Sequence, residues 1–268
     1  MIRFAKAHAY GNDFLYVEET AMGGVDLPAL ARRICERHTG VGADGLIVYE
    51  RTAGGASMRL FNADGGRAEV SGNGVRGLAA LLLHQEKRID ARVTIETEAG
   101  TKDALRTSRD GNRQTFRTDM GLPSDLRQIS LQTVDAGGRS EPVQAVVLNF
   151  GNPQCVILGT LPADERFRYL GSTLEHHPMF PDGTNVEFAC VERPDLVRIV
   201  IWERGVGPTM SSGTGSCASL VAAAAFGGAD RDALVVAPGG AQRVEWRETA
   251  VYLTGWAEIV CAGEWLLD

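Results

Sequence analysis

The sequence predicts an α+β protein built from two similar halves, each with one helix held against a curled or barrel-like sheet. A duplicated serine–glycine motif carries this prediction, because Ser-Gly-Asn-Gly at 71–74 returns as Ser-Gly-Thr-Gly at 212–215. Each copy runs into an apolar segment of helical composition, at 78–83 and at 219–226. The second segment ends at Gly227-Gly228, a typical helix stop.

Short β-rich runs accompany each helix, and two of them precede the two serines. The expected strands are 58–62, 92–97, 145–150 and 197–203. Gly11-Asn12 also recurs as Gly151-Asn152, at nearly the same offset as the serines. Several landmarks at one offset indicate a duplicated fold.

The repeat predicts where the two halves begin and end. We expect an N-terminal half at 1–125 and a C-terminal half at 140–268. The polar segment 126–139 is expected to connect them, and the last strand is free to return to the first half.

Composition excludes several classes of protein. A net charge of −7 without a basic stripe argues against nucleic acid as a partner. No apolar run approaches the ~18 residues of a membrane span, and the N-terminus lacks signal-peptide regions, so we expect a cytoplasmic protein without a membrane partner. Five cysteines without CxxC spacing, and no HExxH histidine pair, predict neither a disulfide framework nor a metal site.

Glycine is the one residue type in clear excess. The chain has 32 glycines among 268 residues, about 12%, against a usual ~7%. Without a collagen period, this excess indicates tight turns or sites lined by backbone.

Each serine stands at the start of a predicted helix, where the dipole is positive and backbone N–H groups lack partners. We expect these N–H groups to hold a carboxylate, with Ser71 and Ser212 directed into the same space. If the halves pack face to face, the serines can remove a proton from one face of a carbon and return one to the other. The expected donors are Gly72, Asn73, Gly213 and Thr214.

Two other interpretations of the serine turns remain open at this point. A phosphate cradle would need the Lys and Ser/Thr ending of a P-loop or three spaced glycines, and neither copy has them. The turns could also serve only the duplicated fold.

Polar residues at expected strand ends and glycine turns suit a zwitterionic ligand. An arginine can grip a carboxylate through two hydrogen bonds, while a glutamate and asparagines can accept from an ammonium. The expected binding residues are Asn12, Asn62, Asn152, Asn185, Glu203 and Arg204.

From end to end, the motifs of this chain resemble those of the diaminopimelate epimerase family, in the same order and spacing. They are Gly11-Asn12-Asp13-Phe14, Gly42-Ala43-Asp44-Gly45, Phe61-Asn62-Ala63-Asp64-Gly65, Gly72-Asn73-Gly74-x-Arg76, Gly151-Asn152-Pro153, Glu203-Arg204-Gly205-x-Gly207 and Gly213-Thr214-Gly215. The resemblance implies two pseudo-symmetric domains, each a mixed sheet around a central helix, with the active site in the cleft between them. It also implies a cofactor-free interconversion of LL- and meso-2,6-diaminopimelate, a step towards lysine and cell-wall peptide.

The chain departs from the family at the reacting groups. Ser71 and Ser212 stand where the family has its two acid/base cysteines, and Gln154 stands where a supporting histidine is expected. A thiol has a pKa of about 8.5, whereas an alcohol is a far weaker acid and needs a neighbouring base. Glu203 is then the obvious ionisable helper. Cys261 replaces a tyrosine associated with the family's dimer contact, which leaves a homodimer open.

The binding residues, by contrast, all match, and several of them in the family hold the distal amino-acid end of the substrate. This favours a ligand with two amino-acid termini over proline or hydroxyproline. We expect an isomerase, with Ser71, Ser212 and Glu203 as catalytic residues and no cofactor.

Three alternatives remain. The chain could bind a diamino-dicarboxylate without turning it over, or catalyse an elimination or double-bond shift in the same cleft. The serines could also be introduced replacements for cysteines.

Overall fold

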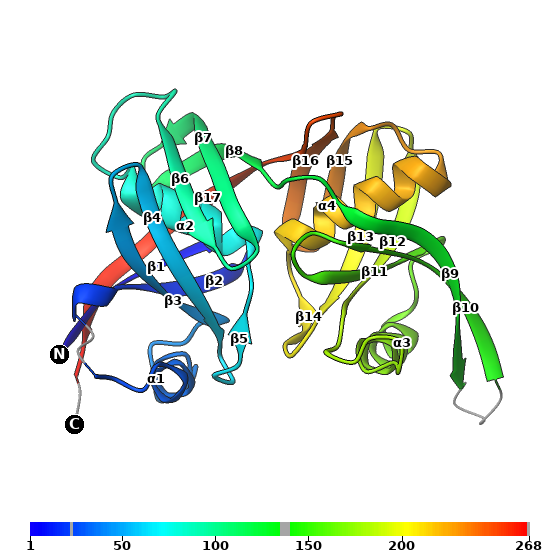
Figure 1. The fold of residues 1–268 in the computed structure, drawn as a ribbon, viewed down its shortest axis with the longest axis horizontal. Coiled ribbons are helices and arrows are strands. Elements are labelled where there is room, and N and C mark those ends of the chain that lie inside the picture. The colour runs from blue at the N-terminus through cyan, green and yellow to red at the C-terminus, as the bar shows by residue number, and fades with distance from the viewer. Residues whose placement is uncertain (22–23, 135–139, 267–268) are drawn as a thin grey trace. The chain divides into compact units, whose positions relative to one another are not determined.

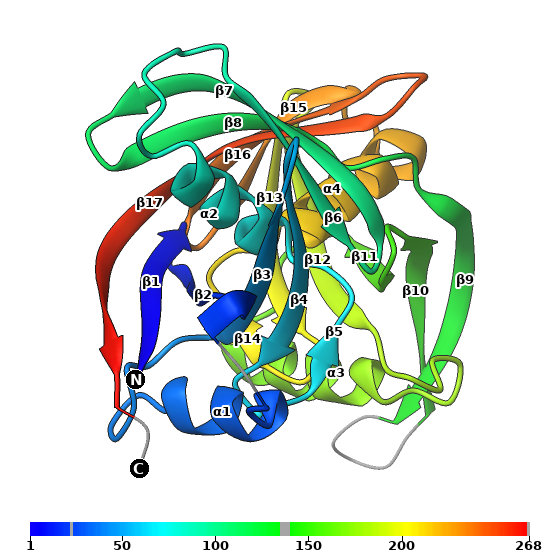
Figure 2. The ribbon, with the colours of Figure 1, turned by 60° about the vertical axis from the view of Figure 1, so that its left-hand side comes forward.

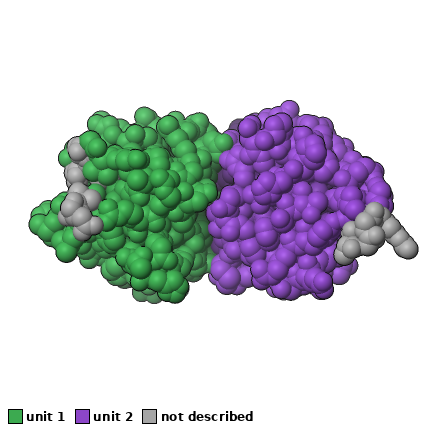
Figure 3. All heavy atoms as spheres, turned by 90° about the horizontal axis from the view of Figure 1, so that it is seen from below, with its two compact units in different colours: residues 1–119, 253–268 green, residues 120–252 purple. Residues whose placement is uncertain are grey.

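The computed structural model describes residues 1–21, 24–134 and 140–266, which form two compact units (Figure 1). One unit comprises residues 1–119 and 253–268 and the other residues 120–252, as coloured in Figure 3. We refer to them as unit 1 and unit 2. Within the described ranges, no helix has the length and apolar character needed to cross a membrane.

Strands dominate both units. Those of unit 1 are β1 (Ile2–Ala9), β2 (Asn12–Glu18), β3 (Gly45–Thr52), β4 (Gly55–Asn62), β5 (Arg67–Ala68), β6 (Arg92–Thr97), β7 (Gly100–Asp110), β8 (Arg113–Asp119) and most of β17 (Val251–Trp265). Those of unit 2 are β9 (Ser124–Val134), β10 (Ser140–Asn149), β11 (Pro153–Leu158), β12 (Asn185–Arg193), β13 (Leu196–Glu203), β14 (Gly207–Thr209), β15 (Asp232–Ala237) and β16 (Gly240–Trp246).

The helices are few and short. They are α1 (Leu27–Ile34) and α2 (Gly72–Leu82) with a 3₁₀ turn at Glu19–Ala21 in unit 1, and α3 (Asp164–Glu175) and α4 (Gly213–Ala222) in unit 2. A π-helical turn, Ala223–Gly227, extends α4, and Gly228 closes it with a φ of 80°. The predicted helix stop at Gly227-Gly228 is confirmed. Glycine suits this position because it adopts the left-handed region without strain.

Unit 1 is a barrel around α2. Each strand pairs with the next in the order β17, β1, β2, β3, β4, β6, β7 and β8, and β8 pairs back to β17. Helix α2 packs against β1, β2, β6, β7 and β8 (Figure 2). The expected barrel-like mixed sheet around a central helix is confirmed in this unit.

Unit 2 repeats the strand pairing of unit 1. Antiparallel β10–β11, parallel β11–β12, antiparallel β12–β13 and parallel β13–β15 match β1–β2, β2–β3, β3–β4 and β4–β6. Helix α4 then takes the place of α2, and β9 pairs with β10 as β17 pairs with β1. The duplication read from the motifs is therefore present in the topology.

The unit boundaries differ from those expected. Most of the segment expected to connect the halves, 126–139, belongs to strand β9, which pairs with β10 along its length. Its remaining residues, 135–139, lie outside the described part of the chain. Residues 253–268, expected in the C-terminal half, belong to unit 1, to which the last strand returns.

The two recurring Gly-Asn turns share one backbone conformation. Gly11 has a φ of 90° and Gly151 a φ of 91°. Gly11 lies directly before β2, and Gly151 lies two residues before the start of β11. Such φ values favour glycine because they strain other residues. Part of the glycine excess thus serves the duplicated turns.

The central helices are buried on nearly all sides, as expected of helices enclosed by a sheet. In α2 the residues from Gly72 to Ala80 are buried, and all ten residues of α4 are buried. Burying a side chain such as Leu78 or Leu220 contributes about 1.5–3 kcal/mol. Helices α1 and α3 are amphipathic instead, each with one buried face.

A glycine inside α2 allows the helix to approach β2 closely. A Cβ at Gly77 would lie 2.8 Å from Cζ of Tyr16 and still closer to its hydroxyl, which donates to the Gly74 carbonyl oxygen at 3.1 Å. We predict that Gly77→Ala lowers the free energy of unfolding by about 1–3 kcal/mol through overpacking, measured by urea denaturation.

Gly54→Ala is the matched control, because no heavy atom lies within 4 Å of the corresponding Cβ position. It should stay within about 0.5 kcal/mol of the parent. Equal effects of the two substitutions would contradict this packing account.

Candidate functional site

The two serines begin the two central helices with the same geometry. Ser71 (φ −130°, ψ 122°) and Ser212 (φ −132°, ψ 132°) are the N-caps of α2 and α4. The Oγ atom of each accepts a hydrogen bond of 3.1 Å from the N–H group three residues on, at Gly74 or Gly215. This is the ordinary capping role of serine, and it leaves the hydroxyl hydrogen to donate elsewhere.

The predicted anion donors occupy the first two positions of each helix. At Gly72, Asn73, Gly213 and Thr214 the helix itself offers no acceptor for the backbone N–H. Helix α2 and helix α4 also direct the positive ends of their dipoles there. Each unit therefore presents a serine hydroxyl beside N–H groups suited to a carboxylate.

In unit 1 a chain of side-chain amides joins the Gly-Asn turn to the start of α2. Asn12 donates to Asp44 Oδ2 at 2.8 Å and accepts from Asn73 Nδ2 at 3.0 Å. Asn73 in turn accepts from the buried guanidinium of Arg76. Asn12 thus holds the serine turn in place, besides the ligand-binding role predicted for it.

Asp44, which accepts from Asn12, belongs to a cluster of charged side chains. Arg37 donates to Asp13 at 2.9 Å and to Asp44 at 2.7 Å, and Lys6 lies 2.9 Å from Asp13. Burial alone would raise the pKa of Asp13, but hydrogen bonds from Arg37 and Lys6 outweigh it and lower that pKa. Burial raises the pKa of Asp44, which receives fewer bonds from cations.

Unit 2 carries the equivalent amide chain. Asn152 donates to Thr214 Oγ1 at 3.3 Å, whereas at the equivalent place in unit 1 Asn12 accepts from Asn73. Gln154, where the family's histidine was expected, is fully buried and donates to Asn152 Oδ1 at 2.7 Å. An amide in this place orients Asn152 but cannot take up a proton.

The Glu203-Arg204 turn at the end of β13 is braced by a buried carboxylate. Glu175 accepts from Trp202 Nε1 at 2.6 Å and from the Gly205 N–H at 2.8 Å. Asn185 Oδ1 accepts from the Arg204 N–H at 2.9 Å. The structure therefore brings Asn185, Glu203 and Arg204 together at one end of β12 and β13.

Asn62 is the unit 1 counterpart of this position. It is the last residue of β4, as Glu203 is of β13, and it pairs with Gly45 of β3. Its side chain is half-buried, at the strand end where the sequence analysis expected it.

Sequence reasoning missed Glu187. This residue lies on β12 with no exposed surface, and neither of its carboxylate oxygens has a hydrogen-bond partner among the residues that the structure describes. Burial, and next the charge of Glu203, raise its pKa well above the ordinary value. The available signal was a lone glutamate within the otherwise apolar run 186–191.

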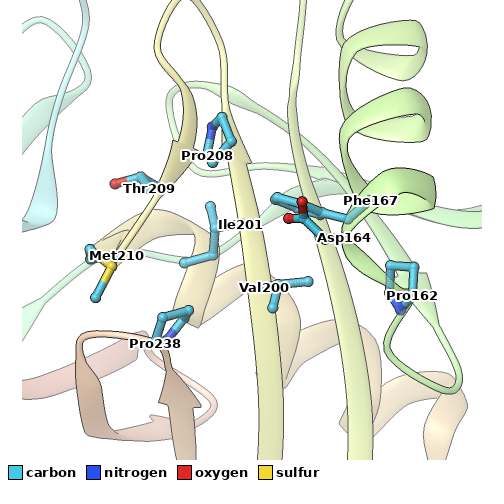
Figure 4. Close-up of a pocket in the computed structure, with 9 residues that line it drawn as sticks. All are labelled: Pro162, Asp164, Phe167, Val200, Ile201, Pro208, Thr209, Met210 and Pro238. Atoms are coloured by element: carbon cyan, nitrogen blue, oxygen red, sulfur yellow. The ribbon is translucent and has the colours of Figure 1, made fainter.

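A cavity of about 370 Å³ in unit 2 contains none of the predicted residues (Figure 4). Phe167, Val200 and Met210 are among its mainly apolar lining side chains, and the one carboxylate, Asp164, accepts from Arg168 at 3.0 Å. Among the residues that the structure describes, no three histidine, cysteine or carboxylate side chains gather as metal ligands.

The serine caps should contribute to stability. We predict that Ser71→Ala and Ser212→Ala each lower the free energy of unfolding by about 1 kcal/mol, because one N–H of each first turn loses its acceptor. Ser→Gly at either position should lower the free energy of unfolding by only about a few tenths of a kcal/mol. Urea denaturation measures both, and an alanine variant as stable as the parent would show that the capping bond contributes nothing.

Glu187 should make stability depend on pH. It binds its proton more tightly in the folded chain, so its contribution is fully present below the ordinary pKa of 4.5 and is lost as pH rises through the raised value. We predict that the parent loses stability relative to Glu187→Gln as the pH rises from 4.5 through the raised pKa of Glu187. A constant difference in urea midpoint over that range would refute the raised pKa.

Comparison with known proteins agrees with the motifs. A diaminopimelate epimerase family model matches residues 4–125 and 146–260. The diaminopimelate epimerase of Desulforudis audaxviator is 41% identical over 281 residues, covering 99% of each chain. That of Synechococcus elongatus is 38% identical over 277 residues, covering 98% of this chain and 97% of the relative.

Solved structures share the fold at low identity. A probable proline racemase from Agrobacterium radiobacter matches with a TM-score of 0.77 and 18% identity, over 100% of this chain and 94% of the other. A hydroxyproline epimerase from Agrobacterium vitis matches with a TM-score of 0.72 and 17% identity, over 98% and 91%. The resemblance drawn from the motifs is confirmed, and the chain belongs to the diaminopimelate epimerase family.

Proposed function

We propose that this chain is an amino-acid epimerase that interconverts LL- and meso-2,6-diaminopimelate by proton transfer at one α-carbon. The observation that carries the proposal is the matched pair of serine-capped helix starts, one in each unit, with the same backbone angles and the same capping distance. Relatives named diaminopimelate epimerase, at 36–41% identity over nearly the whole chain, support the substrate.

The helix starts suit the charge that the reaction develops. Removing the Cα proton of an amino acid places negative charge on Cα and the adjoining carboxylate. Backbone N–H groups at Gly72, Asn73, Gly213 and Thr214 are donors already oriented for such charge. Donors that need no reorganisation stabilise the transition state more than water does.

Ser71 and Ser212 are the proposed acid and base at the reacting carbon. The Cα–H bond breaks as one serine oxygen takes the proton and the electron pair stays on Cα. The other serine then gives its hydroxyl proton to the opposite face, which inverts the centre. Because a serine hydroxyl is a weak acid, the accepting serine needs an ionisable helper, and Glu203 is the predicted one.

Asn12, Asn62, Asn152, Asn185, Glu203 and Arg204 are the proposed substrate-binding residues, with the N–H groups above. Asn185 and the Glu203-Arg204 turn form one polar group in unit 2. A guanidinium beside a carboxylate and an amide can hold the second, unreacting amino-acid terminus of diaminopimelate.

We also propose that the reaction uses no cofactor and takes place in the cytoplasm. Free thiols are present at Cys35, Cys155, Cys190 and Cys261, which is compatible with a reducing compartment. A homodimer remains a prediction.

Binding without epimerisation is a second candidate, and one observation favours it. In the described structure neither serine hydroxyl donates to a base, and the helping histidine of the family is the amide Gln154. A chain of this kind would hold a diamino-dicarboxylate and leave its stereocentre unchanged.

Incubation with LL-diaminopimelate in deuterated water separates the two candidates. We predict deuterium at Cα by NMR and meso isomer by chiral chromatography, and neither with the Ser71→Ala/Ser212→Ala double variant. Calorimetric binding of the parent without exchange would establish the second candidate in place of the first. If the parent showed no binding and no exchange, both candidates would be contradicted.

Restoring the thiols should raise the rate. We predict that Ser71→Cys/Ser212→Cys increases the exchange rate by about 10²-fold or more, because a thiolate forms far more readily near neutral pH than an alkoxide. The same exchange measurement checks this. An unchanged rate would mean that residues 71 and 212 do not carry the proton.

A further inference from the structure

Glu187 lies directly beneath the first turn of α4, on the strand β12 against which that helix packs. A Cβ at Gly215 would lie 2.6 Å from Glu187 Oε1 and 3.1 Å from Ser212 Oγ. The carboxylate and the serine oxygen therefore border the same small space. That space is open only because residue 215 is glycine.

The repeated unit shows that the serine turn does not need this carboxylate. In unit 1 a Cβ at Gly74 would lie 2.7 Å from Cδ1 of Ile47 and 3.6 Å from Ser71 Oγ. Ile47 is on β3, the counterpart of β12. An apolar side chain thus supports one serine turn and a carboxylate supports the other.

A carboxyl group buried without hydrogen bonds costs free energy that an isoleucine would not. Among the described residues both Glu187 oxygens lack hydrogen-bond partners, whereas the buried carboxylate of Glu175 in the same unit accepts from Trp202 and Gly205. Strongly perturbed carboxylates of this kind are found at functional sites more often than elsewhere. The proximity to Ser212 indicates which group Glu187 serves.

Within the described part of the chain, no cation contributes to the pKa shift of Glu187. Glu203 on β13 is the charged neighbour that raises its pKa, Glu187 in turn raises the pKa of Cys155 on β11, and α4 contributes the Ser212 turn. Burial is the larger cause and Glu203 the smaller, and both keep its pKa high. A carboxylate with a raised pKa is a stronger base than an exposed one.

We propose that Glu187 is the proton acceptor for the Ser212 hydroxyl, an inference that rests on the proposed epimerase function. As the Cα–H bond breaks, its proton passes to Ser212 Oγ while the Ser212 hydroxyl proton passes to a Glu187 carboxylate oxygen. The serine stays neutral, Glu187 becomes a carboxylic acid, and the electron pair remains on Cα. Glu187 acts through Ser212 and does not touch the substrate.

The first test measures the pair without turnover. The parent chain, labelled with ¹³C at glutamate carboxyls, is titrated by NMR, with the Glu187 signal assigned through Glu187→Gln. Ser212→Ala should raise the Glu187 pKa, because the ionised form loses the hydroxyl that is proposed to donate to it, and Ser71→Ala should leave it unchanged. Identical Glu187 titrations in the parent and Ser212→Ala would overturn the proposal, whatever the activity.

The second test uses the exchange reaction. Glu187→Gln keeps the shape of the side chain, and Glu187→Ile reproduces the packing of unit 1. Both should fold and should lower kcat for Cα exchange by about 10²-fold or more, with KM unchanged. The parent rate should rise with pH through the pKa of Glu187, since only the ionised form accepts a proton, and this rise should be absent in Glu187→Gln.

The two tests distinguish failure of the inference from failure of the proposed function. If Glu187→Gln had the kcat and the pH profile of the parent, the role of Glu187 would be overturned while the epimerase function stayed in place. A parent chain without exchange, but with a Glu187 titration that responds to Ser212→Ala, would refute the epimerase function and support the pairing.

Discussion

Each central helix begins inside its own unit, so the N–H groups of its buried first turn must find acceptors there. A serine oxygen satisfies one of them, at Gly74 in α2 and at Gly215 in α4. The amide chains from Asn12 and Asn152 reach the second residue of each helix and hold the turn in position. The donors at the first helical positions follow from helix geometry, so the fold itself creates two turns of the kind that suits an anion.

The two units share one topology, but the side chains at equivalent positions near the serine turns differ in chemical character. Ile47 and Glu187 take equivalent places beneath the two serine turns, one apolar and one ionisable. Asn62 and Glu203 likewise end equivalent strands. The repeat therefore supplies the geometry twice, while single substitutions at the same strand positions make the turns chemically different.

Much of this could be predicted from the sequence, because the repeat and the caps are local patterns. Ser71, Ser212 and the Gly11 and Gly151 turns lie where their motifs placed them. Strand β9 was read as a connector because it is exposed along most of its length, so its polar composition hid its pairing with β10. Glu187 carries no motif, and its place within the apolar run 186–191 was the one hint in the sequence of its burial under α4.

We propose that Ser71 and Ser212 serve opposite faces of one α-carbon. Deuterium exchange of each pure diaminopimelate isomer, followed by NMR with the single variants Ser71→Ala and Ser212→Ala, tests it most directly. A remaining serine can still remove and return a proton on its own face, so each variant should exchange one isomer, and the two variants opposite ones. Exchange of the same isomer by both variants, or of both isomers at the parent rate, would contradict the account.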